Sequence, residues 1–509
     1  MPNLKTKSMM PTLKTLSAGA LVLAALEQAH AQYTPPPPPT PFQGFLNEYL
    51  RAQNPYMNQW DFGGTDRLRF EDKSGFAIQG HTGSVDFRDH GADMVNDYFL
   101  NRLRFHVGYT EKWWSAYVEP QSSVALSDER FAYANAPAIP GTVKRKENGP
   151  EADAIDLHQA YFTLGNHKEF PLSLKAGRQE LSYGEERLVG AFGWNNVGRS
   201  FDAAKVRWQN EFFGADFFTG YPVIPENGKF IDVDNTHDWF SGIYATSTKI
   251  PTTILDVYFL SRNADRKAIN TEPSPQFPQP TARDIYTIGG RLKSKPGELG
   301  NFDYSLEGAY QFGDFADPTK PALTAPRLKQ DAFMFVAQGG YTFADLWATP
   351  RLGLEYDYSS GDGNSADGMH GTFDNLFPTN HKFYGYMDFI SLQNIQDVRG
   401  ELTLKPTTRL SVALEGHGFW LANTHDYFYN VAGAPRTTGG ASGYGIHSGY
   451  SPFVGTELDL IAGYALTRYA QIEGGYGHFF TGKYIQQSLV SAGGERDADY
   501  AYVQFTLNF

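Results

Sequence analysis

The chain ends in DADYAYVQFTLNF, residues 497 to 509, and this stretch alternates between two kinds of side chain. Phe509, Leu507 and Phe505 fall on one side of an extended strand, and the polar residues between them fall on the other. Successive side chains of a strand point to opposite faces, so the pattern predicts a β-strand with one apolar and one polar face. In lipid no strand edge can remain unpaired, and we therefore expect this last strand to close against the first.

The same period of two recurs along the chain from about residue 75. In YFLNRLRFHVGY, residues 98 to 109, Phe99, Leu103 and Phe105 alternate with Arg102 and Arg104. Counting every such segment predicts about 18 strands, an even number within the range of outer-membrane barrels.

The connections between these segments alternate in length. Short connections are expected near residues 209–211, 249–251, 406–408 and 466–468, and long ones near 127–153, 221–238, 263–283, 313–330, 361–394 and 422–453. An up-and-down barrel has short turns at one end and long loops at the other. A soluble sandwich explains this alternation less well, since one face of each strand would have to pack on a second sheet. The sequence thus predicts an all-β, transmembrane, antiparallel up-and-down barrel.

The overall composition is consistent with that class. Aromatic residues make up 15% of the chain and there are 52 glycines, whereas the mean hydropathy is only -0.43. No stretch of the body approaches the roughly 20 apolar residues of a membrane-spanning helix. The formal charge of -13 argues against nucleic acid as a partner, because phosphate binding requires a basic surface. The lack of cysteine excludes disulfides and thiolate metal sites.

The first residues predict export from the cytoplasm. Lys5, Lys7 and Lys14 precede an apolar run, and Ala29 and Ala31 stand at the positions expected before a cleavage site. We therefore expect a signal peptide at 1–31, a proline-rich periplasmic extension at 32–66 and the barrel at 67–509. The expected location is the bacterial outer membrane, with both termini periplasmic and the long loops extracellular. Its lipid and lipopolysaccharide are expected partners, as is the insertion machinery, which would read the terminal Phe509.

Two stretches resemble the alginate export family of outer-membrane proteins. They are GRQELSYGEERLVG with GRSFD, between residues 177 and 202, and SGD with FPTNHKFYGYMD, between residues 360 and 388. The resemblance implies an 18-stranded barrel with an arginine-rich lumen for passive passage of an anionic polysaccharide such as alginate. The long periplasmic loop that occludes the family's pore has no counterpart at the short turn around Thr467 and Arg468. An outer loop therefore either takes over gating, or the channel is not gated in that way.

Several cations are expected to face the lumen, where arginine could bind the carboxylates of a passing solute. Those placed there by the strand pattern are Arg102, Arg104, Lys175, Lys205, Arg207, Arg291, Lys293, Arg351 and Arg399, and those in the family-like stretch are Arg178, Arg187 and Arg199. Inward acids such as Glu355 could instead pair with them and only complete the wall. The glycines between residues 184 and 198 would let that stretch bend into the pore or form a plain surface loop.

Other chemistry has little basis in the sequence. Asp362, Asn364 and Asp367 are a weak calcium candidate, because their spacing departs from a calcium-binding loop. No nucleophile motif is present, so we expect neither catalysis nor a cofactor. The main functional hypothesis is a channel for an anionic polysaccharide or oligosaccharide. The alternative is a substrate-selective porin for uptake of small organic acids or sugars.

Overall fold

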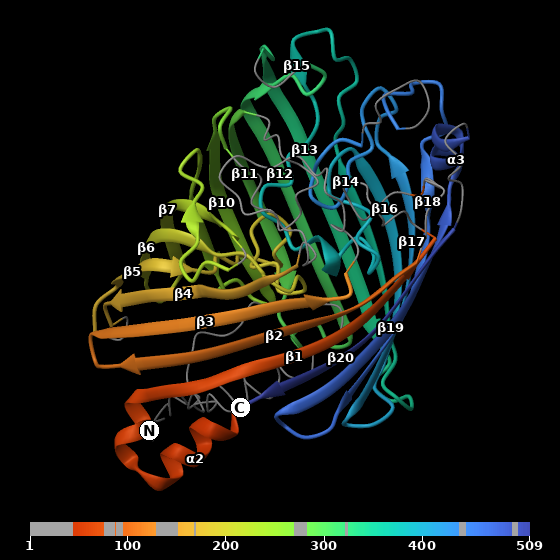
Figure 1. Ribbon diagram of the computed structural model, residues 1–509. Helices are drawn as coiled ribbons and strands as arrows, with labels where there is room; N and C mark the ends of the chain where they lie inside the picture. Colours follow the sequence, from red (N-terminus) through yellow and green to blue (C-terminus); the bar gives the residue numbers. More distant parts are fainter. Residues whose placement is uncertain are drawn as a thin grey trace, which may run out of the picture.

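A closed antiparallel barrel dominates the computed structural model, which describes residues 44–75, 87, 95–128, 151–166, 169–226, 228–268, 282–320, 324–436, 444–490 and 497–509 (Figure 1). Twenty strands occur in these ranges, and two of them, β8 (Val233–Asp234) and β15 (Met369–His370), are two-residue pairings in loops. The remaining eighteen form the wall. The predicted strand number and topology are thus confirmed.

The wall strands follow one another around the barrel in chain order. They are β1 (Trp60–Ser74), β2 (Val95–Thr110), β3 (Trp114–Leu126), β4 (Asp153–Leu164), β5 (Leu172–Gln179), β6 (Phe201–Gln209), β7 (Gly214–Ile224), β9 (Asp238–Ser247), β10 (Thr253–Ala264), β11 (Arg283–Ser294), β12 (Phe302–Ala316), β13 (Arg327–Thr342), β14 (Arg351–Ser359), β16 (Ile395–Leu404), β17 (Leu410–Leu421), β18 (Phe453–Ala465), β19 (Ala470–Thr481) and β20 (Ala498–Asn508). Helices α2 (Phe45–Gln53) and α3 (Lys483–Leu489) and the short turns η1 (Pro55–Gln59) and η3 (Asn380–Lys382) complete the described elements.

The first and last strands close the barrel, as the sequence predicts. β1 pairs with β2 along one edge and with β20 along the other, so that Phe70 lies opposite both Phe99 and Val503. Beyond β20, Phe509 and Gly64 exchange two backbone hydrogen bonds of 2.9 and 3.1 Å. We call the β1–β20 pairing the seam.

Helix α2 lies beside the seam, at the same end of the barrel as the C-terminal end of the chain (Figure 1). The Asn47 side chain accepts a hydrogen bond of 2.7 Å from the backbone of Phe62 and donates one to Asp61. Glu48 accepts a hydrogen bond of 2.6 Å from the hydroxyl of Tyr469 in the β18–β19 turn. The helix therefore connects the first strand to a turn late in the chain.

The barrel begins earlier in the chain than the sequence indicated. We placed its start at Arg67, whereas β1 begins at Trp60. The adjacent Gly63 and Gly64 interrupt the pattern, and the structure explains Gly64: a Cβ there would overlap the ring of Phe509. The expected signal peptide at 1–31 and the five consecutive prolines lie outside the described residues.

The two faces of the wall differ as a membrane barrel requires. Along β2 the outward Leu103 and Phe105 are 41% and 39% exposed, whereas the side chain of the inward Arg104 is only 14% exposed. Outward apolar side chains are exposed on strands all around the barrel, for example Ile288, Phe335 and Leu458. Apolar groups on the outside and charged groups inside suit a barrel in lipid. None of the described helices combines the length and apolarity needed to cross a bilayer.

Two long loops enter the barrel. The first inward loop, residues 180–200, joins β5 to β6, and the second inward loop, residues 360–394, joins β14 to β16. Phe373, Phe377 and Phe389 of the second loop are at most 1% exposed. The inward bend allowed by the glycines of the first loop is confirmed. The expected long connection at 361–394 is present, and the burial of its many apolar side chains shows that it folds into the barrel.

Candidate functional site

The two inward loops join to form one partition inside the barrel. The backbone of Gly190 donates to the carbonyl of Phe377 (2.8 Å), Phe377 donates to Leu188 (3.0 Å), and Thr379 donates to Glu186 (2.9 Å). These contacts form a short parallel bridge, in which Val189 pairs with Phe377. We refer to the joined loops as the partition.

Arginines of β1 and β2 hold one side of the partition. Arg67 and Arg102 each donate a hydrogen bond of 2.9 Å to the carbonyl oxygen of Gly193, and Arg69 donates one of 2.9 Å to that of Trp194. Hydrogen bonds from a charged donor are stronger than neutral ones. The guanidinium groups on this part of the wall thus position the first inward loop. Neither Arg67 nor Arg69 was singled out from the sequence.

Trp194 joins the wall to both loops. The guanidinium of Arg69 lies 3.9 Å from the centre of its ring system, and the imidazole of His381 is stacked 3.9 Å from it with an interplanar angle of 9°. A cation over an indole face and a stacked ring are both attractive contacts. Trp194 therefore fixes the second inward loop, which carries His381, to the first and to β1.

Arg187 holds the opposite side of the partition. Its guanidinium pairs with Glu355 and lies 3.4 Å from Asp357, both on β14, and it donates a hydrogen bond of 3.1 Å to the hydroxyl of Tyr384. The side chain is 1% exposed. Burial would lower the pKa of Arg187, but the carboxylates of Asp357 and Glu355 raise it well above its usual value. The residue thus remains a cation and joins both loops to the wall.

Glu185 makes a second contact between the first inward loop and the wall. One carboxylate oxygen lies 2.8 Å from Lys293 and 3.5 Å from Arg291, both on β11, and the other accepts a hydrogen bond of 3.0 Å from Ser305 on β12. Burial would raise the pKa of Glu185, but Lys293 and Arg291 hold it well below its usual value. Both predicted cations are therefore used in anchoring the loop.

The second inward loop has its own anchors on the wall. Asp374 pairs with Arg283 on β11 and lies 3.9 Å from Arg262 on β10. At its other end the backbone of Met387 donates a hydrogen bond of 2.8 Å to Glu457 on β18. Sequence reasoning missed these residues. The density of apolar residues in FPTNHKFYGYMDFISL was the available signal that this segment avoids water.

Most of the other predicted arginines are also paired. Arg199 donates to three loop carbonyls within 3.0 Å, and the others pair with acids: Arg178 with Asp202 (2.8 Å), Arg291 with Asp256 (2.6 Å), Arg351 with Asp303 (2.6 Å) and Glu401 (2.9 Å), and Arg399 with Glu355 (2.5 Å). The interpretation that acids of the wall pair with inward cations therefore describes most of the predicted set.

A different arrangement occurs between the partition and the short turns, on β5 and β6. We call Lys175, Lys205 and Arg207 the basic patch. Lys205 and Arg207 share the carboxylate of Asp216 on β7, at 3.5 and 2.9 Å. The ammonium group of Lys175 lies 3.5 Å from the ring centre of Tyr161, and no carboxylate of the described residues comes within 4.0 Å of it. The patch thus has three basic side chains and one acid that pairs with two of them.

Arg104 lies beside this patch and has its own partners. It donates hydrogen bonds to Gln121 (2.5 Å) and to Glu180 (3.0 Å), the first residue of the first inward loop. Burial would raise the pKa of Glu180, but the hydrogen bond from His158 and the charge of Arg104 lower it to about 2. Glu180 is therefore ionised at neutral pH and balances Arg104.

The opposite part of the wall carries mostly acids. Seven carboxyl side chains at most 5% exposed lie on β14 to β18: Glu355, Asp357, Asp397, Glu401, Glu415, Glu457 and Asp459. His417 lies among them, 2.9 Å from Asp397 and 3.7 Å from Glu415. The lumen is thus basic on the β1–β6 side and acidic on the β14–β18 side.

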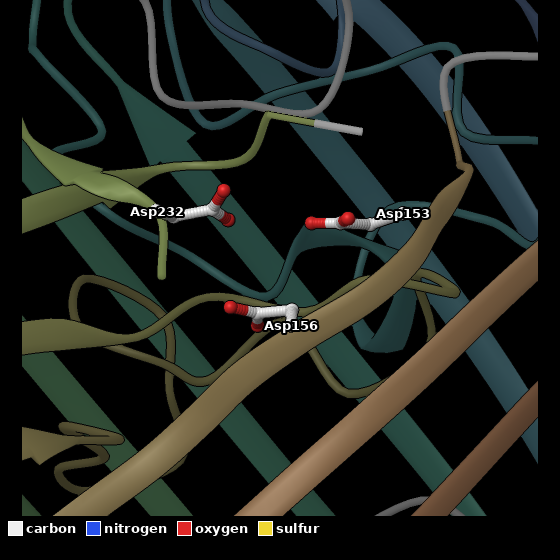
Figure 2. Close-up of side chains that lie close together, drawn as sticks. All are labelled: Asp153, Asp156 and Asp232. Atoms are coloured by element: carbon white, nitrogen blue, oxygen red, sulfur yellow. The ribbon is translucent and has the colours of Figure 1, made fainter. Parts of the chain in front are cut away.

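Three buried aspartates meet near the end of β4. Figure 2 shows the carboxylates of Asp153, Asp156 and Asp232 turned toward one another, and one oxygen of each lies within 4.8 Å of one oxygen of the other two. Arg178 lies 3.8 Å from Asp156 and donates a hydrogen bond of 2.8 Å to the carbonyl of Asp232. Carboxylates are the ligands that Ca²⁺ and Mg²⁺ prefer, so these residues are the described ones that could hold such an ion.

The weak calcium candidate has another explanation. Asp362, Asn364 and Asp367 each accept a hydrogen bond from the backbone two residues further on, at 2.9, 3.2 and 2.9 Å. Such side-chain contacts are typical of turns. Within the described ranges, the three side chains do not form a group with ligand spacing.

Known structures share the fold at very low sequence identity. Acinetobacter baumannii OccAB1 is 8% identical with a TM-score of 0.56, and the match covers 88% of this chain and 96% of that one. Pseudomonas aeruginosa OpdK, solved with vanillate, is 10% identical with a TM-score of 0.54 and coverages of 88% and 98%. A BenF-like porin from Pseudomonas fluorescens Pf-5 is 7% identical with a TM-score of 0.52 and the same coverages. These likenesses show the barrel fold.

Sequence comparison identifies the family. A search of curated proteins found no match to this chain. The model of the family described as "Alginate export" matches residues 60–499, which begin with the first residue of β1 and end within β20. The resemblance noted in the two loop stretches is thereby confirmed. The chain belongs to the Alginate export family.

Proposed function

We propose that this outer-membrane channel passes carboxylated saccharides, single acidic sugars or short uronate oligomers, by facilitated diffusion and without a cofactor. The observation that carries the proposal is the basic patch, where Lys175, Lys205 and Arg207 face the lumen with one carboxylate among them. Uncompensated positive charge on a pore wall attracts anions and repels cations. A polysaccharide such as alginate is the longer substrate of the same chemistry.

The size of the solute separates this proposal from a second candidate function, that of a porin for the uptake of small organic acids. The partition favours the second candidate, since two joined loops anchored on both sides reduce the space for a polymer. The likeness to OpdK, whose structure contains vanillate, is in line with it. Family membership favours the saccharide. We therefore place the preferred solute at the small end of the uronates.

We further propose that both termini and the short turns lie in the periplasm, with the long loops outside the cell. The C-terminal end of the chain and α2 lie at one end of the barrel, and α3 and β15 at the other (Figure 1). This arrangement is the usual one for outer-membrane barrels, whose turns are short on the periplasmic side. Outer-membrane lipid and lipopolysaccharide would then surround the wall. The insertion machinery would bind the terminal strand before closure.

Planar-bilayer recording tests the proposal. We expect a reversal potential that shows anion preference in a salt gradient, and concentration-dependent block of the current by glucuronate and by short uronate oligomers. Block that weakens beyond a few sugar rings would agree with the small size proposed here. Cation preference, or equal block by glucose and glucuronate, would refute the carboxylate specificity. Growth of a deletion strain on single solutes, compared with polymer retained in its periplasm, would give the direction of transport.

A further inference from the structure

We infer that Lys175 and Lys205 form a carboxylate-binding subsite on the turn side of the partition, an inference that rests on the proposed function. The two residues are direct partners in the β5–β6 register, Lys175 opposite Lys205. Directly opposite side chains of an antiparallel pair share a face and have Cβ atoms about 4.5 to 5.5 Å apart. The two ammonium groups therefore start from neighbouring points on the lumen wall.

Two like charges at paired positions are unfavourable unless an anion lies between them. Asp216 relieves this repulsion only in part, because it lies 3.5 Å from Lys205 and is also bonded to Arg207 at 2.9 Å. Lys175 has no such carboxylate among the described residues. The position opposite Lys205 thus carries an amino group that has no carboxylate partner among the described residues.

Tyr161 holds the ammonium group of Lys175 in place without a carboxylate partner from the described part of the chain. The ammonium group lies 3.5 Å from the centre of the Tyr161 ring, whose other neighbour is the stacked ring of Tyr117 at 5.1 Å. A cation–π contact attracts an ammonium group but leaves its charge and its N–H donors in place. Lys175 can therefore still donate to a solute, whereas Arg67 and Arg102 already donate to a loop carbonyl and Arg187 pairs with Glu355.

The ligand that fits is a carboxylate carried by a small solute. A carboxylate has two oxygens, each of which can accept from one ammonium group, and such charge-assisted hydrogen bonds are stronger than neutral ones. Lys175 lies three residues after Leu172, where β5 begins. Lys205 lies four residues before Gln209, where β6 ends. The subsite therefore lies near the short turns. There it would bind an anion that has just passed the partition, or one that is about to reach the partition from the other direction.

The experiment is a titration of current block in planar bilayers with glucuronate, with acetate to separate charge from sugar and glucose as the neutral arm. We expect Lys175→Gln to raise the half-blocking concentrations of both glucuronate and acetate about tenfold, the effect of losing one charged hydrogen bond. Lys205→Gln should cause a smaller rise, because Asp216 already uses part of that charge. Lys175→Arg should restore most of the block. A rise with glucuronate alone would contradict a subsite that recognises the carboxylate.

Lys329→Gln is the matched control, since Lys329 lies on the outward face of β13 with its side chain 70% exposed. This substitution removes one lysine charge outside the lumen. The half-blocking concentrations of glucuronate and acetate should therefore equal those of the unaltered protein. If the channel is anion-selective and the Lys175→Gln and Lys329→Gln variants have equal half-blocking concentrations, the subsite is refuted but the proposed function is not. A lack of anion preference in the unaltered protein would overturn both. Thermal unfolding in detergent establishes that each variant retains the barrel.

Discussion

Arg187 on the first inward loop and Glu355 on β14 form an ion pair between positions 168 residues apart in the chain. Both side chains are 1% exposed. A buried ion pair adds little net stability compared with an apolar contact. Removing one of its partners, however, strongly destabilises the protein because the other charge is left buried and unpaired. The pair therefore fixes where the partition lies more than it stabilises the barrel.

Arg187→Gln should loosen the partition, because it leaves Glu355 and Asp357 buried without this cation. Removing one partner of a buried pair costs about 3–5 kcal/mol. We expect larger and noisier single-channel conductance, and a lower midpoint of thermal unfolding in detergent. The double variant Arg187→Gln/Glu355→Gln should recover part of the lost stability. Arg327→Gln, which breaks an exposed pair with Asp284, is the control and should change neither quantity.

Trp194→Leu should separate the two inward loops from each other without changing any charge. The substitution removes the ring that contacts both Arg69 and His381. Loss of one cation–π contact and one stacked pair amounts to roughly 1–3 kcal/mol. We expect frequent transitions between conductance levels. A steady trace with the conductance of the unaltered protein would show that the partition does not depend on Trp194.

Gly385→Ala should disturb the second inward loop where it contacts β18. Gly385 has a φ of +86°, and a Cβ there would overlap the carboxyl group of Glu457, which accepts the hydrogen bond from Met387. We expect the free energy of unfolding to fall by roughly 3 kcal/mol, because the strained backbone conformation and the overlap both destabilise the folded state. Gly297→Ala is the matched control, because Gly297 has a φ of +73° in a short turn with open space around it. Gly297→Ala should lower the free energy of unfolding by only about 1–2 kcal/mol, seen as a smaller fall in the midpoint of thermal unfolding.

The anion preference should fall as the pH rises from 7 to 9. Burial lowers the pKa of Lys382 on the partition to about 8, although the charge of Glu186 offsets part of this shift. Lys382 is thus charged at pH 6 and neutral at pH 9.5. The reversal potential should therefore show the unaltered channel as more anion-selective than Lys382→Gln at pH 6, and the two as equal at pH 9.5. A constant difference across this range would contradict the assignment.

Much of the wall was predictable because its pattern is local. The period of two placed Arg102 and Arg104 on the inward face and Leu103 on the outward face, and the structure agrees. The short connections likewise followed from polar residues between apolar segments. Closure of the barrel followed from the requirement that a strand edge in lipid be paired.

The partition could not be predicted in the same way, because its contacts join distant positions. Arg102 faces the lumen as expected, yet it donates to the carbonyl of Gly193, and a backbone acceptor leaves no trace in the sequence. The pairing of Arg187 with Glu355 depends on how far each loop reaches. Lys175 resembled the other cations in the sequence, and only the surroundings of its ammonium group distinguish it.

The seam has a consequence for the order of assembly. The ring of Phe509 occupies the space beside Gly64, and the ring of Phe45 on α2 lies 6.4 Å away. Both arrangements require that β1 and β20 have already paired. If a cellular factor recognises the terminal aromatic ring, as we propose, we expect it to bind the ring before β1 and β20 pair, and closure to weaken that contact.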